Sequence, residues 1–245
     1  MRRPLLTSQT TCRTDTYRNK PSALETGYLR GVRVAASVEI EDALRILSAT
    51  RPVFHSEADF QLAFAWQVQQ MDPAMRVRLE TGLTAGVHLD IAFARPDLRH
   101  SSAIELKFLT RLWKGTVDGE LYELKGHGAQ DNRSYDVVKD ISRIEQLVES
   151  GLVNDGAVLV LTNDGAYWRQ PKANDIADAA AFRTGEGVVL SGRRNWARDR
   201  TGTGTERAQP LDLRGRYELH WADYATLPGG GPAAQVRQLV VPVLG

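Results

Sequence analysis

The chain has 245 residues, of which 42% are hydrophobic and 25% are charged, so it can bury a core and is not disordered throughout. Cys12 is the single cysteine, which excludes a disulfide framework and a cysteine-ligated zinc site. No apolar run approaches the roughly 20 residues that span a bilayer, and the basic N-terminus lacks the apolar part of a secretory signal. We therefore expect a cytoplasmic protein that does not contact a membrane.

Charge is distributed unevenly along the chain. Residues 1–33 carry seven Lys and Arg against two acidic residues and show no helical or strand period, which predicts a flexible basic tail. Residues 34–245, expected to form a single domain, hold the remaining 24 basic and 28 acidic residues. A body with a net negative charge is not a general binder of polyanions, so any contact with nucleic acid there requires a local basic patch.

Two helices are predicted at the start of the folded region. Apolar residues at helical spacing indicate the first helix over residues 37–49. Ser56 is a good N-cap with Asp59 three residues later, and it begins a second helix that runs to about Gln70. The inward faces of the two helices are apolar and consist of Ile40, Ala43, Leu44 and Leu47 in the first and Phe60, Phe64 and Val68 in the second.

Three strands and a hairpin follow these helices. The strands cover about residues 77–80, 88–93 and 103–108, and each alternates apolar and polar residues as half-buried antiparallel strands do. Pro96–Arg99 is the expected turn between the second and third strands. Further along, an Asp-Gly pair at 118–119 predicts the tip of a separate hairpin.

The remaining elements complete a mixed sheet. They are a helix over 134–150, a strand over 156–162, a helical piece over 174–182 and strands over 217–221 and 236–241. The strand over 156–162 is a continuous apolar run, which indicates burial on both faces at the centre of the sheet. The order α-β-β-β-α-β predicts an α/β fold with a mixed sheet flanked by helices. Its core covers about 54–163, and 164–245 form a C-terminal extension.

The turn at Pro96–Arg99 determines which residues of its two strands face each other. Centring the hairpin there places Asp90 opposite Glu105 and His88 opposite Lys107, with all four on one face. The other face is apolar and contains Leu89, Ile91, Phe93, Ile104, Leu106 and Phe108. Two opposed carboxylates repel each other, and a divalent cation between them removes the conflict. An adjacent lysine completes a set suited to metal-assisted hydrolysis of phosphodiesters.

These residues also carry a resemblance to a known superfamily. Asp90, fourteen intervening residues and then Glu105-Leu106-Lys107 resemble the D…(D/E)-x-K signature of the PD-(D/E)XK nucleases, which have the restriction-endonuclease-like fold. The superfamily has an α-β-β-β-α-β core, which matches the order predicted over 54–163. Leu89 precedes Asp90 where the motif often has proline, and this is the one departure within the motif.

The resemblance implies a catalytic set and a cofactor. The catalytic residues would be Glu57, Asp90, Glu105 and Lys107, and Asp90, Glu105 and Leu106 would bind Mg²⁺, for which Mn²⁺ can substitute. Lys107 would serve the attacking water, and Glu57 would support the metal site from the preceding helix. Basic residues after the third strand and on the long helix are expected to contact nucleic acid, namely Lys114, Lys125, Arg133, Lys139 and Arg143.

Each of these assignments has a structural alternative. Glu105 and Lys107 could form a solvated strand face with a cross-strand ion pair, and Glu57 could be a favourable charge at a helix N-terminus. Lys139 and Arg143 could belong to a solvated helix face. The favoured function is a Mg²⁺-dependent nuclease acting on DNA in restriction, defence or repair, and a homodimer is compatible with it. A non-catalytic interaction module with the same fold is the alternative, and a nucleotide phosphohydrolase lacks a glycine-rich phosphate loop.

Overall fold

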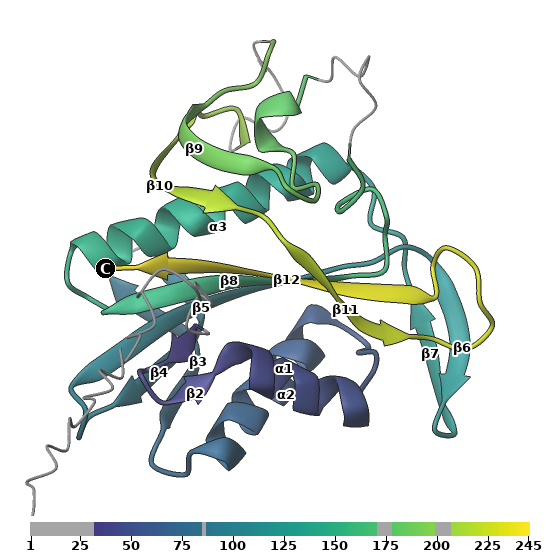
Figure 1. Cartoon of the computed structure of the whole chain (residues 1–245), viewed down its shortest axis with the longest axis horizontal. Coiled ribbons are helices and arrows are strands. Elements are labelled where there is room, and N and C mark those ends of the chain that lie inside the picture. Colours follow the sequence, from purple (N-terminus) through teal and green to yellow (C-terminus); the bar gives the residue numbers. More distant parts are fainter. Residues whose placement is uncertain (1–31, 85–86, 171–177, 199–206) are drawn as a thin grey trace, which may run out of the picture. The chain divides into compact units, whose positions relative to one another are not determined.

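A six-stranded mixed sheet runs through the centre of the protein (Figure 1). The computed structural model describes residues 32–84, 87–170, 178–198 and 207–245. In spatial order the strands of the sheet are β11 (Trp221–Thr226), β12 (Gln235–Leu244), β8 (Asp155–Thr162), β5 (His100–Leu109), β4 (Val87–Arg95) and β3 (Arg76–Thr84). Neighbouring strands are antiparallel except β5 and β8, which are parallel and are connected through a helix. The protein therefore has the mixed α/β architecture that the element order predicts.

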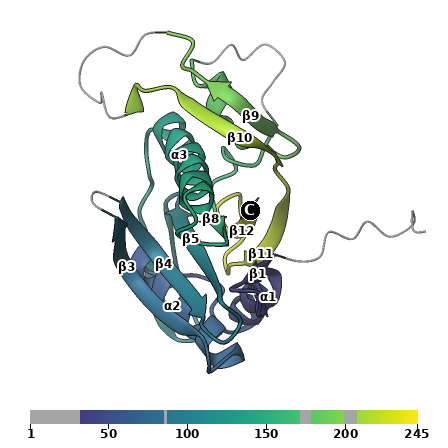
Figure 2. The ribbon, with the colours of Figure 1, turned by 90° about the vertical axis from the view of Figure 1, so that its left-hand side faces the viewer.

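Helices cover both faces of this sheet. Figure 2 shows α1 (Ile40–Thr50) and α2 (Glu57–Met71) on one side and α3 (Gln130–Glu149) on the other. The side chains of the central strand β8 contact both layers. Ala157, Leu159 and Leu161 belong to the hydrophobic cluster that includes α1 and α2. Val158 and Val160 pack with the α3 cluster. Burial of β8 on both faces is therefore confirmed, and it follows from the unbroken apolar run.

The predicted helices form with the expected inward faces. In α1 the four predicted core residues are all buried, and in α2 the three predicted core residues are buried as well. The Ser56 side chain accepts a hydrogen bond from the backbone N–H of Asp59, as the N-cap prediction requires. Within the part of the chain that the structure describes, none of the helices combines the length and apolar character needed to cross a bilayer.

The start of the folded region differs from the prediction. The first helix begins at Ile40 rather than residue 37, because Val38–Glu39 form β2, which pairs with β1 (Arg33–Val34). Ala35 and Ala36 have positive φ angles and make the turn between these strands. Arg33, assigned to the flexible tail, therefore belongs to the fold, and residues 1–31 lie outside the described part.

The C-terminal extension contains an additional two-stranded ribbon. β9 (Val189–Arg194) and β10 (Leu211–Glu218) pair with each other and pack over α3. The predicted strand over 217–221 is wrong, because β10 ends at Glu218 and β11 starts at Trp221 in a different sheet. The predicted helical piece over 174–182 lies partly outside the described residues, and its described end is the 3₁₀ turn η1 (Ala180–Phe182).

The hairpin of β4 and β5 has the predicted register over part of its length. Five pairs, from Arg95 opposite His100 to Ile91 opposite Ile104, follow the predicted alignment around the turn. The ladder then ends, so the predicted pairs of Asp90 with Glu105 and of His88 with Lys107 are both absent from it. Leu89 packs with the α3 cluster although Ile91 packs with the α1 and α2 cluster, which corrects the prediction of one continuous apolar face.

A second hairpin, β6 (Trp113–Val117) and β7 (Glu120–Leu124), lies beside the N-terminal end of α2. Its predicted tip is confirmed, because Asp118 and Gly119 have φ angles of 50° and 84°, as a type I′ turn requires. Tyr122 stacks on His55 with ring centroids 4.2 Å apart, and Glu120 accepts a hydrogen bond from the Tyr122 hydroxyl. The stacking on His55 holds the hairpin against the residues that precede the helix.

Candidate active site

The candidate site lies where β4 and β5 separate. At this point the carboxylate of Asp90 takes the place of a backbone partner, and its Oδ2 accepts a hydrogen bond of 2.7 Å from the Leu106 N–H. The carbonyl of Asp90 accepts a hydrogen bond of 2.5 Å from Gln61 Nε2, one turn along α2 from Glu57. Two elements therefore hold Asp90 beside Glu105, and Gln61 is a positioning residue that the sequence analysis missed.

Glu105 is buried and paired with a helix residue from the opposite layer. Its side chain is 1% exposed, and Arg143 Nη1 lies 2.7 Å from its Oε1. The same Arg143 nitrogen donates to the carbonyl of His88 at 2.9 Å. The alternative of a solvated strand face is therefore wrong for Glu105, and Arg143 reaches across from α3 to the sheet.

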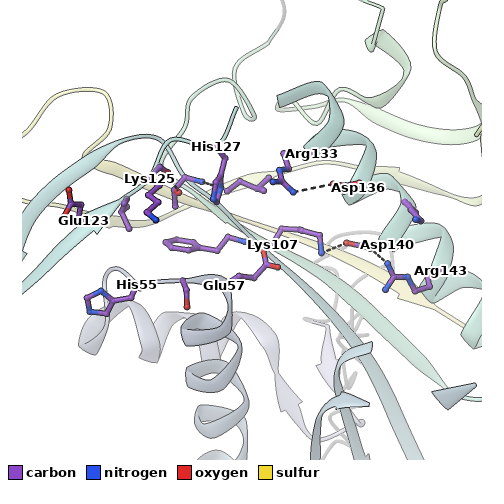
Figure 3. A pocket seen from close by; sticks show the side chains of 16 residues that line it. His55, Glu57, Lys107, Glu123, Lys125, His127, Arg133, Asp136, Asp140 and Arg143 are labelled. Atoms are coloured by element: carbon purple, nitrogen blue, oxygen red, sulfur yellow. Dashed lines mark hydrogen bonds and ion pairs between the residues drawn. The ribbon is translucent and has the colours of Figure 1, made fainter. Parts of the chain in front are cut away.

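Lys107 is also paired with α3. Its Nζ lies 2.7 Å from Asp140 Oδ2 and donates to the Leu106 carbonyl at 3.0 Å. Asp140 is 2% exposed, and its other oxygen is 2.7 Å from Arg143 Nη2 (Figure 3). Asp140 was not predicted as a site residue. Its helical spacing from Arg143 is visible in the sequence, but the sequence does not show that this face of α3 turns toward Glu105 and Lys107.

Glu57 completes the cluster from the first turn of α2. Its Oε2 accepts a hydrogen bond of 2.8 Å from the Phe108 N–H, immediately after Lys107. The helix N-terminal position expected for Glu57 is thus real, and it also directs the carboxylate toward the end of β5. Four carboxylates and two cations, all within or beside the end of β5, form one charge network.

Burial and mutual repulsion shift the pKa values of this network. Burial raises the pKa of Glu57, Glu105 and Asp140, and the negative charge of Asp140 and Asp90 raises that of Glu105 further. Burial acts to lower the pKa of Lys107, but the adjacent Asp140 and Glu57 outweigh this effect and raise it. Lys107 is therefore held protonated, and Glu57, Glu105 and Asp140 bind their protons more tightly than free carboxylic acids do.

The donor chemistry of the cluster suits a hard divalent cation. Asp90, Glu105 and the Leu106 carbonyl are oxygen donors, which Mg²⁺ prefers, and each accepts a hydrogen bond from a protein N–H group in this structure. Among the described residues, no group of three or more His, Cys, Asp or Glu side chains is arranged so that it could hold a metal ion. The residues fit Mg²⁺ by donor type alone, and Arg143 is bonded to one of the carboxylates.

A cavity of about 630 Å³ opens above this network. Glu57, Lys107 and Asp140 contribute to its wall, and Asp90 and Glu105 are not among the lining residues. Four of the five basic residues predicted to contact nucleic acid line it, namely Lys125, Arg133, Lys139 and Arg143.

Lys114, the fifth predicted basic residue, is placed elsewhere. It does not line the cavity and faces Glu123 across the hairpin, with Nζ 3.8 Å from the Glu123 carboxylate and a side chain that is 61% exposed. The structure therefore separates Lys114 from the other four. His127, another basic residue of the segment between β5 and α3, lines the cavity as well.

Comparison of the chain with models of protein families, with curated proteins and with solved structures finds no match.

Proposed function

We propose that the protein is a Mg²⁺-dependent nuclease with a restriction-endonuclease-like fold, and that DNA is its substrate. The observation that carries the proposal is a single cavity with two kinds of charge. Its base adjoins the buried carboxylates around Lys107, and another part of its wall presents Lys125, Arg133 and Lys139. A polyanion can bind such a cavity through the basic wall, while a cation at the carboxylates faces the phosphate to be cleaved.

The residues of the cluster have distinct parts in this proposal. Asp90, Glu105 and the Leu106 carbonyl would hold Mg²⁺, which when bound polarises the phosphate and favours ionisation of the attacking water. Lys107 orients that water and offsets charge on the phosphate, and its raised pKa keeps it protonated for this purpose. Asp140 positions Lys107 through their 2.7 Å ion pair. In-line attack would form a bond from the water oxygen to phosphorus as the bond to the leaving oxygen breaks, with the water losing a proton to solvent and the leaving oxygen taking one from it.

One observation favours a second candidate, a non-catalytic interaction module. Arg143 bridges Glu105 and Asp140, and Lys107 bonds Asp140, so a chain of ion pairs partly neutralises the cluster without a metal. Such a chain of ion pairs can serve as a buried polar core. Removal of one member then lowers the free energy of unfolding, because its partner is left as an unpaired buried charge. The two candidates differ in whether the cluster binds Mg²⁺ and whether Lys107 is needed for a reaction.

A cleavage assay with matched lysine variants separates the candidates. Plasmid DNA, single-stranded DNA and RNA are incubated with the full chain in Mg²⁺, in Mn²⁺ and in EDTA. We expect metal-dependent cleavage by the wild type, complete loss in Asp90→Ala and Lys107→Ala, and retention in Lys114→Ala, whose side chain lies outside the cavity. Absence of cleavage together with absence of calorimetric Mn²⁺ binding by the wild type would favour the interaction module.

A further inference from the structure

The segment that contains Lys125 and His127 is hydrogen-bonded to the end of β5 through one residue, Thr110. Thr110, three residues after Lys107, is buried and makes three hydrogen bonds with this segment. Its hydroxyl donates to the Lys125 carbonyl at 2.6 Å, its N–H donates to His127 Nδ1 at 3.1 Å, and its carbonyl accepts from the His127 N–H at 2.7 Å. Thr110 therefore fixes both the backbone and the ring of His127.

The bond from Thr110 determines the state of the His127 ring. A backbone N–H can only donate, so the Nδ1 that faces it carries no proton and accepts. The neutral ring then carries its proton on Nε2. Burial and the nearby charge of Arg133 lower the pKa of His127, which is consistent with a neutral ring. His127 is thus a fixed hydrogen-bond donor, and among the described residues Nε2 has no bonded partner.

Two cations stand beside this donor. Lys125 and Arg133 line the same cavity, and in Figure 3 they lie with His127 on the side away from Glu57 and Lys107. We refer to Lys125, His127 and Arg133 as the basic roof. Arg133 has a long contact of 3.8 Å with Asp136, and within the described part of the chain the Lys125 ammonium has no carboxylate partner. The roof therefore presents hydrogen-bond donors and positive charge to a cavity that Glu123 and Asp136 also line.

We infer that the basic roof is a second phosphate subsite, which binds a non-scissile phosphate of the same nucleic-acid strand whose scissile phosphate lies at Lys107. The inference rests on the proposed nuclease function and names the part of the substrate that the roof recognises. His127 donates from Nε2 to an oxygen of this phosphate, and Lys125 and Arg133 supply its charge complement. A neutral imidazole held by Thr110 suits this task, because its donor points in one direction and does not require protonation.

The test measures binding without cleavage, so it does not depend on catalysis. A short single-stranded DNA is prepared with one neutral methylphosphonate linkage, moved along the strand, and affinities are measured in Ca²⁺ and in EDTA. We expect one non-scissile position at which the neutral linkage weakens wild-type binding about tenfold. His127→Ala should weaken binding of unmodified DNA by a similar factor, and the two changes together should cost no more than either alone.

His55→Ala is the matched control. His55 lines the same cavity, but its Nε2 is already 2.9 Å from Glu120 Oε1 and its ring is stacked on Tyr122. In this variant the effect of the neutral linkage should persist at full size. If the linkage and His127→Ala act additively at every position, the subsite does not exist.

A spectroscopic measurement on the wild type guards against a merely structural effect of His127→Ala. Nitrogen-15 NMR should show His127 protonated on Nε2 alone at neutral pH, with the Nε2 resonance shifted by the unmodified strand and not by the strand that is neutral at the critical linkage. A ring protonated on Nδ1, or equal shifts with both strands, would overturn the inference. If the effects of His127→Ala and of the neutral linkage are non-additive but the protein cleaves no nucleic acid, the phosphate subsite is supported and the proposed nuclease activity is refuted.

Discussion

The isosteric variant Glu105→Gln offers a thermodynamic test of the charge cluster. Glutamine keeps the shape of the side chain and its oxygen acceptor for Arg143, which lies 2.7 Å from Glu105 Oε1. It cannot ionise. Burial, with the negative charges of Asp140 and Asp90, raises the pKa of Glu105 from 4.5 to about 9. The folded protein therefore holds this proton more tightly than the unfolded chain does, and stability is lost as the pH rises between these two values.

The size of the effect follows from the pKa shift. Each pH unit above the unfolded pKa and below the folded one costs about 1.4 kcal/mol of stability, because the unfolded chain releases the Glu105 proton and the folded protein keeps it; the loss at pH 7 is at most about 3 kcal/mol. Local relaxation and entry of water reduce this cost, and we expect Glu105→Gln to stabilise the metal-free protein by about 1–3 kcal/mol at pH 7. This corresponds to a rise in melting temperature of about 3–10 °C for a domain of this size.

Melting curves in EDTA from pH 4.5 to pH 9 give the measurement. The difference between Glu105→Gln and wild type should be near zero at pH 4.5 and should grow with pH. Glu123→Gln, which removes an exposed carboxylate of the hairpin, should show no such trend. Mg²⁺ should narrow the difference by stabilising the wild type. A Glu105→Gln protein that melts below the wild type throughout, or a difference independent of pH, would refute this account of the cluster.

Three further predictions address the lysine, the basic wall and the support of Asp90. Lys107→Ala should abolish cleavage, and it should lower the free energy of unfolding by about 1–3 kcal/mol because the buried Asp140 carboxylate loses one partner. Calorimetry should show a nearly unchanged Mn²⁺ affinity, since an ammonium group is not a metal ligand. Lys139→Ala should reduce the slope of log affinity for DNA against log salt by about one unit or less, whereas Lys114→Ala should not change it in the same filter-binding series. Gln61→Leu should lower the free energy of unfolding by about 1–3 kcal/mol and reduce cleavage, because Asp90 loses the hydrogen bond to its carbonyl; urea unfolding and the plasmid assay measure the two effects.

The features of the fold that could be predicted are those determined by residues close to one another in the sequence. Helical spacing was sufficient for the inward faces of α1 and α2, and an unbroken apolar run was sufficient for the central position of β8. The short turn after Arg95 was sufficient for the register of β4 and β5 as far as Ile91 and Ile104. Beyond that pair the alignment fails, because the Asp90 side chain bonds the Leu106 N–H in place of a ladder partner.

The sequence by itself indicated Asp90, Glu105 and Lys107 of the candidate site, because their alternation in two strands joined by a short turn is a local property. Only the tertiary structure decided that Glu105 is buried, that Asp140 and Arg143 of α3 bind Lys107 and Glu105, and that Thr110 holds His127 over the cavity. These contacts join residues far apart in the chain. Their formation depends on the rotation and position of α3 above the sheet, which is set by packing of the whole apolar core and leaves no periodic signal in the polar residues themselves.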